Sequence, residues 1–496
     1  MPSNALVRSP NYKWWVSSAI AFGTLASVIN HGSVNVALPT IASHFGTDLP
    51  AVQWVVIAEM LTISALLLPM GRMSDLIGRK PVYIAGLVLF AGGAAFAGFS
   101  DTIFLLIIAK VIQGAGAAMT QGTGMAMVTS VFPENERGKG IGTMMSVVGA
   151  GAMIGPVLGG ILVGALGWRW VFFINIPIGI IGIAMAFAIM DSKRFSQDNQ
   201  GAKFDWLGAA LSTAALVTFL MLVTNGHREG WTSLPILAAS VAFPAILAAF
   251  IWWELRTPAP MLDLRLFKHK VFAMGVIAGF ISYLGPNSVR FMMPFYLQGV
   301  LGMKPSQIGF AMLPPAITMI VVGPLAGRMS DRYGWRKFTA TGLMLASIGL
   351  FTLARLSADS SVGRVIASMV LLSVGSAMFS SPNTSAIFNA APQTRHGIVS
   401  ALMSLIRNSA NVTGVAVATT IIAATMVSMG YVPDLGDVKS AESAGLLEAF
   451  VSGFRVVYMT MAGIMLVGVV ASIVTIRVAK SVESEPSAER ETAPAD

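Results

Sequence analysis

The sequence GRMSDLIGRK at residues 71–80 recurs as GRMSDRYGWRK at residues 327–337. Both copies carry glycine, serine, aspartate and basic residues at nearly the same spacing. A match between two such distant segments indicates a chain that is built from two related halves. Internal repeats of this kind are typical of secondary transporters, which bind their substrate between the halves near the middle of the membrane.

The composition also indicates a membrane protein. Of the 496 residues, 55% are hydrophobic and 11% are charged, and the mean hydropathy is +0.73. Soluble globular domains carry about 25% charged residues, so this chain has too few to cover a soluble core of its size. The 50 glycines would let membrane helices approach closely. We therefore predict an all-α membrane protein. The chain has no cysteine, which excludes disulfides and thiolate metal sites.

Fourteen segments are predicted to cross a bilayer as helices, which takes about 20 apolar residues each. They are residues 14–36, 52–70, 82–99, 103–125, 143–165, 171–190, 206–224, 233–253, 271–297, 306–326, 338–356, 363–386, 398–427 and 453–476. The first repeat copy follows span 2, and the second follows span 10 rather than span 8. We therefore predict 14 transmembrane helices, arranged as two six-helix halves with two inserted helices between them.

This arrangement defines the predicted domains. Residues 1–190 form the N-terminal six-helix half, residues 191–260 a linker with the two inserted transmembrane helices, and residues 261–476 the C-terminal six-helix half. Residues 477–496 are polar and rich in Glu, Pro and Ala. Such a composition predicts a disordered tail.

The basic residues predict the orientation in the membrane. Lys and Arg residues outside the spans lie mostly in the N-terminal segment, the even-numbered connections and the tail. The positive-inside rule then places both termini in the cytoplasm. We expect a multi-pass protein of the plasma (inner) membrane, acting as a monomer in the lipid bilayer. This sidedness explains the net charge of +9, so no nucleic-acid partner is expected.

Several motifs resemble those of the major facilitator superfamily, in its fourteen-helix drug:proton antiporter branch. Residues 71–80 are similar to the loop signature of the superfamily, and GAGAMIGPVLGG at 149–160 resembles the antiporter signature. The segments WRWVFFINIP at 168–177, FYLQ at 295–298 and LIRN at 405–408 also match. The resemblance covers residues 14 to 476. It implies alternating access by rocking of the two halves, with proton-coupled export of small amphiphilic organic compounds, as in multidrug efflux.

The repeat loops and span 5 contain candidate gating residues. The set is Gly71, Asp75, Gly78, Arg79, Asp331, Arg332, Gly151, Gly155, Pro156 and Gly159. Asp75 can pair with nearby basic groups and so latch one conformation; the alternative is that these loops only orient the protein. The three span-5 glycines lie along one helical face, and Pro156 removes a backbone donor. They indicate a bendable helix contact, although ordinary close packing would use the same residues.

Span 1 departs from the family pattern at a residue that matters for coupling. Asn30 occupies the place where the branch usually has a carboxylate, and an amide cannot carry a proton. Glu59 in span 2 stands where the branch usually has tyrosine, and it is the only acidic residue well inside a predicted span. Intramembrane carboxylates are costly and usually functional. Glu59 is therefore the candidate proton carrier, the alternative being a structural ion pair.

A polar cluster is predicted around Glu59. Asn30, His31, Glu59, Lys110 and Arg290 fall at similar depths in their spans. His31 is the only histidine inside a span and is a candidate proton relay or a hydrogen-bonded packing residue. The residues expected to line the substrate site are Asn30, Asn35, Lys110, Gln113, Arg290 and Arg407.

The charges inside the spans leave the substrate class open. Lys110, Arg290 and Arg407 face a single carboxylate, which favours neutral or anionic organic compounds over lipophilic cations. An alternative function is therefore a uniporter or proton symporter of a specific anionic metabolite or lipid-like molecule. A non-transporting membrane sensor is a further alternative. No motif for a metal, a cofactor or catalytic chemistry is found, so an enzyme is not expected.

Overall fold

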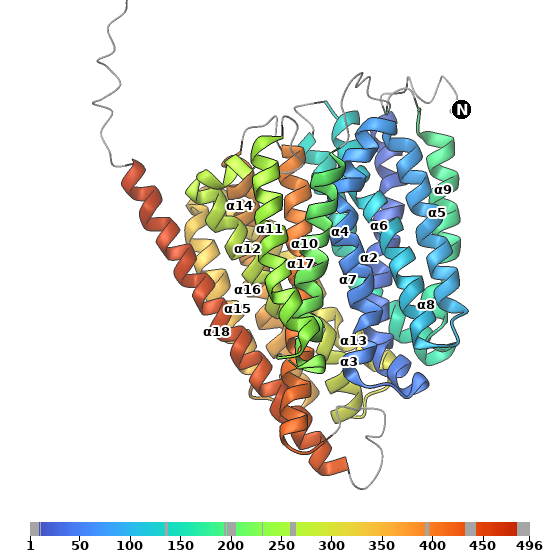
Figure 1. Cartoon of the computed structure of the whole chain (residues 1–496), viewed down its shortest axis with the longest axis vertical. Coiled ribbons are helices and arrows are strands. Elements are labelled where there is room, and N and C mark those ends of the chain that lie inside the picture. Colours follow the sequence, from blue (N-terminus) through green and yellow to red (C-terminus); the bar gives the residue numbers. More distant parts are fainter. Residues whose placement is uncertain are drawn as a thin grey trace, which may run out of the picture.

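The described residues of this computed structural model form an all-helical molecule. They are Ser9 and residues 11–133, 137–192, 195, 205–230, 232–257, 264–391, 396–431 and 443–483. The long helices run roughly side by side along one axis, as expected for membrane spans (Figure 1).

The first group of helices contains the first repeat copy. It comprises α2 (Tyr12–Phe45), α4 (Trp54–Ile77), α5 (Arg79–Gly98), α6 (Ile103–Val131), α7 (Arg137–Ala165) and α9 (Asn175–Ile189), with the short helices α3 (Leu49–Val52) and α8 (Trp170–Phe173). Within it, α2 packs on α7 and α9, and α6 packs on α4 and α5.

The last group contains the second copy. It comprises α12 (Lys270–Phe295), the π-helical turn η3 (Tyr296–Val300), α13 (Pro305–Ala311), α14 (Leu313–Tyr333), α15 (Trp335–Leu353), α16 (Val362–Asn389), α17 (His396–Ser428) and α18 (Ser443–Glu483). Here α16 packs on α14 and α15, and α17 and α18 pack on α12. The two groups meet mainly where α7 contacts α13 and α14, α4 contacts α17, and α2 contacts α12.

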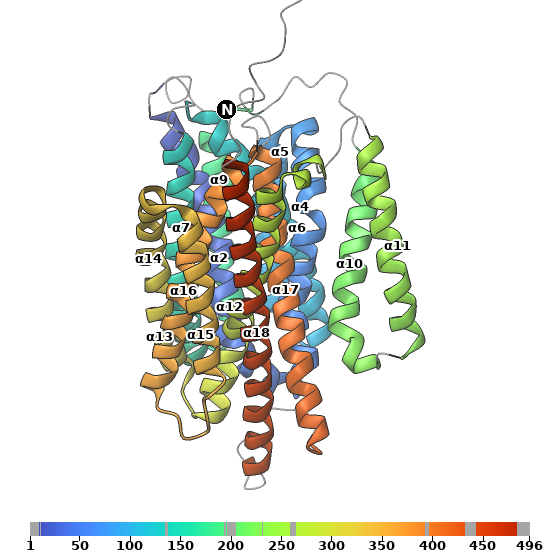
Figure 2. The same cartoon turned by 90° about the vertical axis from the view of Figure 1, so that its left-hand side faces the viewer.

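A helical hairpin separates the two groups in the chain. It consists of α10 (Trp206–Glu229) and α11 (Leu234–Arg256), followed by the 3-10 turn η2 (Leu264–Lys268). The hairpin stands at the side of the molecule (Figure 2). Only α10 of the two makes extensive contact with α4 and α17. A Thr213 hydroxyl on α10 donates a 2.9 Å hydrogen bond to the carbonyl of Ala65 on α4.

All fourteen predicted spans coincide with helical segments, and twelve of these are long and apolar enough to cross a membrane within the described residues. The two others are α2 and α15. Polar residues such as Asn30 and His31 lower the mean hydropathy of α2, and Arg336 and Lys337 at its start lower that of α15. The all-helical membrane fold is thereby confirmed, whereas the count of fourteen spans stays a prediction.

The two repeat copies adopt the same local structure. Gly78 separates α4 from α5 with φ 99° and ψ 140°, and Gly334 separates α14 from α15 with φ 90° and ψ 128°. One turn earlier, the Ser74 hydroxyl donates to the carbonyl of Gly71 at 2.6 Å. The Ser330 hydroxyl donates to Gly327 in the same way, at 2.7 Å. The sequence repeat is therefore also a repeat of backbone geometry.

Replacing either hinge glycine with alanine should destabilise the protein, because residues with a side chain rarely adopt this backbone region. We expect Gly78→Ala and Gly334→Ala each to lower the free energy of unfolding by about 1–3 kcal/mol. At both sites the positive φ disfavours alanine. This holds even at Gly334, where a Cβ atom would meet no neighbour within 4 Å. Gly323→Ala on α14, also in open space but helical, is the control and should not destabilise. Thermal unfolding in detergent would show the difference; equal stability of all three variants would contradict it.

The hydrophobic cores show how the two groups are joined. We call the end where the Gly78 and Gly334 turns lie the basic end, because Arg79, Lys80, Arg336 and Lys337 are there. At the opposite, or far, end, one core combines residues of α2, α4 and α7 with residues of α12, α13, α17 and α18. Toward the basic end the described residues form separate cores, one within the first group and one shared by the second group and the hairpin. The groups are therefore joined by apolar packing mainly at the far end.

The predicted disorder of the tail at residues 477–496 stays a prediction. Helix α18 continues to Glu483, so residues 477–483 are helical. Residues 484–496 lie outside the described part of the chain. The start of α2 and the end of α18 lie at the same end of the molecule (Figure 1).

Candidate functional site

Glu59 lies at the centre of a buried polar network between α2, α4 and α6. Its carboxylate forms an ion pair with the Lys110 ammonium group of α6. The Asn30 amide of α2 donates to both carboxylate oxygens, at 3.2 and 3.5 Å. Glu59, Asn30 and Lys110 are almost completely buried. A buried charge of this kind is tolerated only when it is paired and hydrogen-bonded, and Glu59 satisfies both conditions.

A close approach of α6 places Lys110 beside Glu59. A Cβ atom at Gly114 would lie only 2.7 Å from the Glu59 carbonyl oxygen, so glycine is required where the two helices cross. The Lys110 ammonium also donates to the Gln113 amide oxygen at 2.6 Å, one turn along the same helix. The Phe172 ring of α8 lies 5.6 Å from this ammonium and excludes water from one side.

Asn175 completes the network from a helix that the sequence did not connect with the site. Its amide donates to the Asn30 side-chain oxygen at 3.1 Å and to the Val171 carbonyl at 3.0 Å. The second bond spans the junction between α8 and α9, which brings Asn175 toward α2. An asparagine inside an apolar span is a sign of a buried polar contact. Only the packing of α9 on α2 shows that the partner of Asn175 is Asn30.

His31 links the buried network to the second group of helices. Its Nδ1 lies 3.6 Å from a Glu59 carboxylate oxygen, and its side chain is 21% exposed. Its Nε2 contacts the Met60 sulfur at 3.0 Å, and the Asn411 amide of α17 donates to the same sulfur at 3.3 Å. Sequence reasoning missed Met60 and Asn411, because methionine and asparagine at these positions carry no charge signal.

The second group contributes cations to this region. Arg290 on α12 is solvent-exposed, although its neighbours from Asn287 to Val289 and from Phe291 to Leu297 are buried. Its charge acts on His31 of the first group. Arg407 on α17 is half-buried, and its charge acts on Arg290. Asn35, one helical turn beyond His31, is buried, and its side-chain oxygen has no hydrogen-bond partner among the described residues.

The second group of helices has no counterpart of the polar Lys110–Gln113 pair at the repeat-related positions. A Cβ at Gly93 would lie 2.7 Å from the Gln113 nitrogen, and at the repeat-related Gly349 it would lie 2.5 Å from the Leu372 nitrogen. Leu372 therefore occupies the place of Gln113, and Met369 occupies the place of Lys110. Both are buried and apolar. The Lys110–Gln113 pair is thus a feature of the first group alone.

The span-5 glycines form the contact between α7 and α2. A Cβ at Gly151, Gly155 or Gly159 would lie 2.9, 2.9 or 2.5 Å from atoms of Val28, Ile29 or Ser33, respectively. The Ser33 hydroxyl donates to the Gly155 carbonyl at 2.7 Å. Pro156 lacks the N–H that would donate to the Ala152 carbonyl one turn earlier, yet α7 remains helical through Pro156. The glycines therefore pack tightly as expected, and their gating role stays a prediction.

The structure describes the side chains of only some of the gating residues predicted in the two repeat loops. The side chains of Asp75 and Asp331 lie outside the described part of the structure, so the predicted latch is not visible. The Arg79 guanidinium donates to the Ala126 carbonyl of α6 at 3.1 Å, and Lys80 donates to the Met190 carbonyl at the end of α9. Gly71 lies close to Gly122 of α6, and Arg332 stacks on the neighbouring Tyr333 ring. These contacts fasten the first loop to its own helical group.

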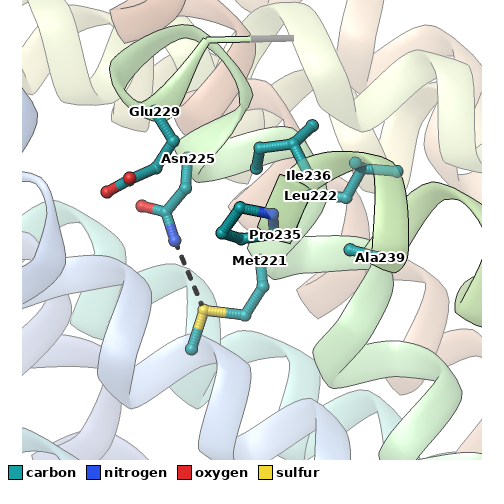
Figure 3. A pocket seen from close by; sticks show the side chains of 7 residues that line it. All are labelled: Met221, Leu222, Asn225, Glu229, Pro235, Ile236 and Ala239. Atoms are coloured by element: carbon teal, nitrogen blue, oxygen red, sulfur yellow. Dashed lines mark hydrogen bonds between the residues drawn. The ribbon is translucent and has the colours of Figure 1, made fainter. Parts of the chain in front are cut away.

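A pocket in the α10–α11 hairpin is unrelated to the polar network. Figure 3 shows its lining, which consists of Met221, Leu222, Asn225, Glu229, Pro235, Ile236 and Ala239. The Asn225 amide donates to the Met221 sulfur at 3.6 Å within it. None of the network residues lines this pocket. Nor do the described residues contain three or more histidine, aspartate or glutamate side chains arranged to hold a metal ion.

The sequence comparisons identify the family. The model of the Major Facilitator Superfamily matches residues 20–415. The chain belongs to the major facilitator superfamily. It is 33% identical over 396 residues to the riboflavin transporter RibZ of Clostridioides difficile, covering 80% of this chain and 85% of that protein. It is 31% identical to the multidrug resistance protein Stp of Mycobacterium tuberculosis, covering 79% of this chain and 72% of that protein.

The solved structures agree on the fold of this superfamily member. A bacterial homologue of the human lysosomal transporter Spinster, in an inward-facing and unoccupied conformation, superimposes with a TM-score of 0.69 at 15% identity. The alignment covers 95% of this chain and 98% of that one. The protein is thus an integral membrane transporter rather than an enzyme, and its relatives include multidrug resistance proteins.

Proposed function

We propose that this protein is a proton-coupled secondary transporter that exports small amphiphilic organic compounds by alternating access. In this proposal the chain forms fourteen spans, with α10 and α11 inserted between halves at residues 1–190 and 261–476. Both termini face the cytoplasm from the plasma (inner) membrane, and the monomer is the working unit. The relatives named as multidrug resistance proteins support the substrate class.

The buried Glu59–Lys110 pair is the observation that supports proton coupling. When Glu59 is ionised, Lys110 neutralises it and Asn30 donates to it. A proton on Glu59 removes this attraction and leaves the Lys110 ammonium with the Gln113 oxygen as its neutral partner. Protonation of Glu59 therefore weakens the electrostatic attraction that holds α4 against α6. His31, near Glu59 and partly exposed, is placed to pass a proton between water and the carboxylate.

The way in which the two groups are joined supports alternating access. Their shared apolar core lies at the far end, whereas their cores at the basic end are separate. If the basic end is cytoplasmic, this conformation faces inward. The Met60 contacts with His31 and Asn411 then connect the proton site to the moving second half.

Transport into proteoliposomes under an imposed pH gradient tests the proposal. We expect the gradient to drive flux of at least one member of a panel of cationic, neutral and anionic amphiphiles. Glu59→Gln should abolish the effect of the gradient, because an amide cannot exchange a proton, while exchange of labelled substrate continues. The control is Asp101→Asn, which changes a carboxylate that is 89% exposed at the far end. Flux that ignores the gradient in both proteins would contradict proton coupling.

A second candidate function is favoured by the cations of the second group. Arg290 and Arg407 suit a specific anionic metabolite or lipid-like molecule, carried by uniport or by symport with protons. The same vesicles distinguish the functions. In antiport the substrate moves in the direction opposite to the flow of protons, whereas in symport it moves in the same direction. In uniport the pH gradient has no effect on substrate flux.

A further inference from the structure

Arg290 occupies an unusual position for a cation. It belongs to the last third of α12, a helix that packs against α2, α16, α17 and α18, yet its side chain is exposed. A charged side chain that faced lipid at this depth would be strongly unfavourable. Its charge also acts on His31, which belongs to the other group of helices. Arg290 therefore faces a water-accessible space between the two groups.

Arg407 brings a second positive charge to the same space. Its charge acts on Arg290, so the two guanidinium groups repel each other. Asn411, one turn further along α17, donates to the Met60 sulfur that also contacts His31. This contact orients the Arg407–Asn411 face of α17 toward the first group of helices.

No described carboxylate neutralises these two arginines. The carboxylates of Glu59 and Asp101 form ion pairs with Lys110 and His31 and with Arg169, respectively, and not with these two arginines. Glu59 is already engaged by the buried Lys110 ammonium. The two arginines stand on α12 and α17, which pack against each other. Like charges on neighbouring helices without a counter-charge are unfavourable, and a bound anion would relieve their repulsion.

We propose that Arg290 and Arg407 together bind the carboxylate of an amphiphilic organic anion, which is the cargo of the transporter. This assignment rests on the proposed transport function and narrows its substrate class. Guanidinium groups are suited to the task, because their planar set of N–H donors matches the two oxygens of a carboxylate. The thioether of Met60, beside His31 and Asn411, offers an adaptable apolar contact for the rest of the molecule.

Binding of three fluorescent probes to the purified full-length protein tests this site. Pyrenebutyrate, pyrenebutanol and pyrenemethylamine share one aromatic group and differ in charge. We expect pyrenebutyrate to bind most tightly. Arg290→Gln and Arg407→Gln should each weaken its binding by about tenfold to a hundredfold, the range for loss of a charged hydrogen bond. Binding of pyrenebutanol should change less than about threefold in the same variants.

Two further variants separate charge from structure. Arg290→Lys keeps the charge and should restore part of the affinity for pyrenebutyrate. Arg455→Gln removes an exposed cation on α18 and should leave all three affinities unchanged. The proposal is overturned if pyrenebutyrate does not bind, if the three probes bind equally, or if the arginine variants weaken all probes alike.

The outcome can be separated from that of the proposed function, because binding is measured without flux. Arginine-dependent binding of pyrenebutyrate without any transport in vesicles would uphold the anion site and contradict the transport function. Conversely, proton-driven flux of amphiphiles with no effect of Arg290→Gln or Arg407→Gln on binding would uphold transport and overturn the anion site.

Discussion

Replacing Glu59 with alanine is expected to lower the free energy of unfolding by about 3–5 kcal/mol, because a buried ion pair would lose one partner. Lys110 would then remain fully buried, and the Gln113 amide oxygen would be its only strong acceptor among the described residues. Asn30 would lose the carboxylate to which its amide donates. Thermal unfolding of the purified protein, followed by circular dichroism, would measure the change.

A second substitution tests whether the pair itself is responsible. The repeat-related position of Lys110 holds Met369, so Lys110→Met introduces a side chain that the fold already accommodates at that place. We expect Glu59→Ala with Lys110→Met to recover most of the lost stability, since no buried charge remains. Asp101→Ala cuts an exposed ion pair and should cost less than about 1 kcal/mol. A double variant as unstable as Glu59→Ala alone would contradict the explanation.

Gly160→Ala is expected to favour opening at the far end of the molecule. A Cβ at Gly160 would lie 2.4 Å from the Pro305 carbonyl, across the contact between α7 and α13. Overpacking of this kind costs about 1–3 kcal/mol. Because the strain exists only while the two groups are in contact there, it should shift the conformational equilibrium roughly fivefold to a hundredfold.

Labelling of a single cysteine would report the shift. The chain has no cysteine, so Ile308→Cys introduces a unique thiol into the shared far-end core. Ile308 is completely buried, and a hydrophilic maleimide should react with this thiol slowly in the parent and several-fold faster with Gly160→Ala. Gly164→Ala is the matched control on the same helix, since its Cβ would meet nothing closer than 3.9 Å. Equal labelling in both glycine variants would contradict the prediction.

Much of the site could be predicted from the sequence, because ionisable residues in apolar spans are conspicuous. Asn30, His31, Glu59 and Lys110 are on three different helices, and the structure brings all four together. The repeated loop likewise predicted two related turns, and Gly78 and Gly334 share one backbone conformation. Their roles in coupling and gating stay predictions.

Other features depend on packing that spacing along the chain does not reveal. Asn175 reaches Asn30 only because α9 begins anew after α8 and lies against α2. Met60 connects the two groups through its sulfur, which no pattern of charge or hydropathy indicates. The spans were also hard to count, since the same polar residues that form the site make α2 less apolar than other spans.

The difference between the repeat copies has a consequence for how such carriers diversify. The repeated helix pair exists in two versions, a polar one with Lys110 and Gln113 and an apolar one with Met369 and Leu372. Chemistry that depends on the polar version is inherited with residues 1–190, whereas Arg290 and Arg407 are inherited with the rest of the chain. In the proposed mechanism, recombination between relatives at the intervening hairpin would exchange the anion-binding arginines while leaving the proton-coupling residues in place.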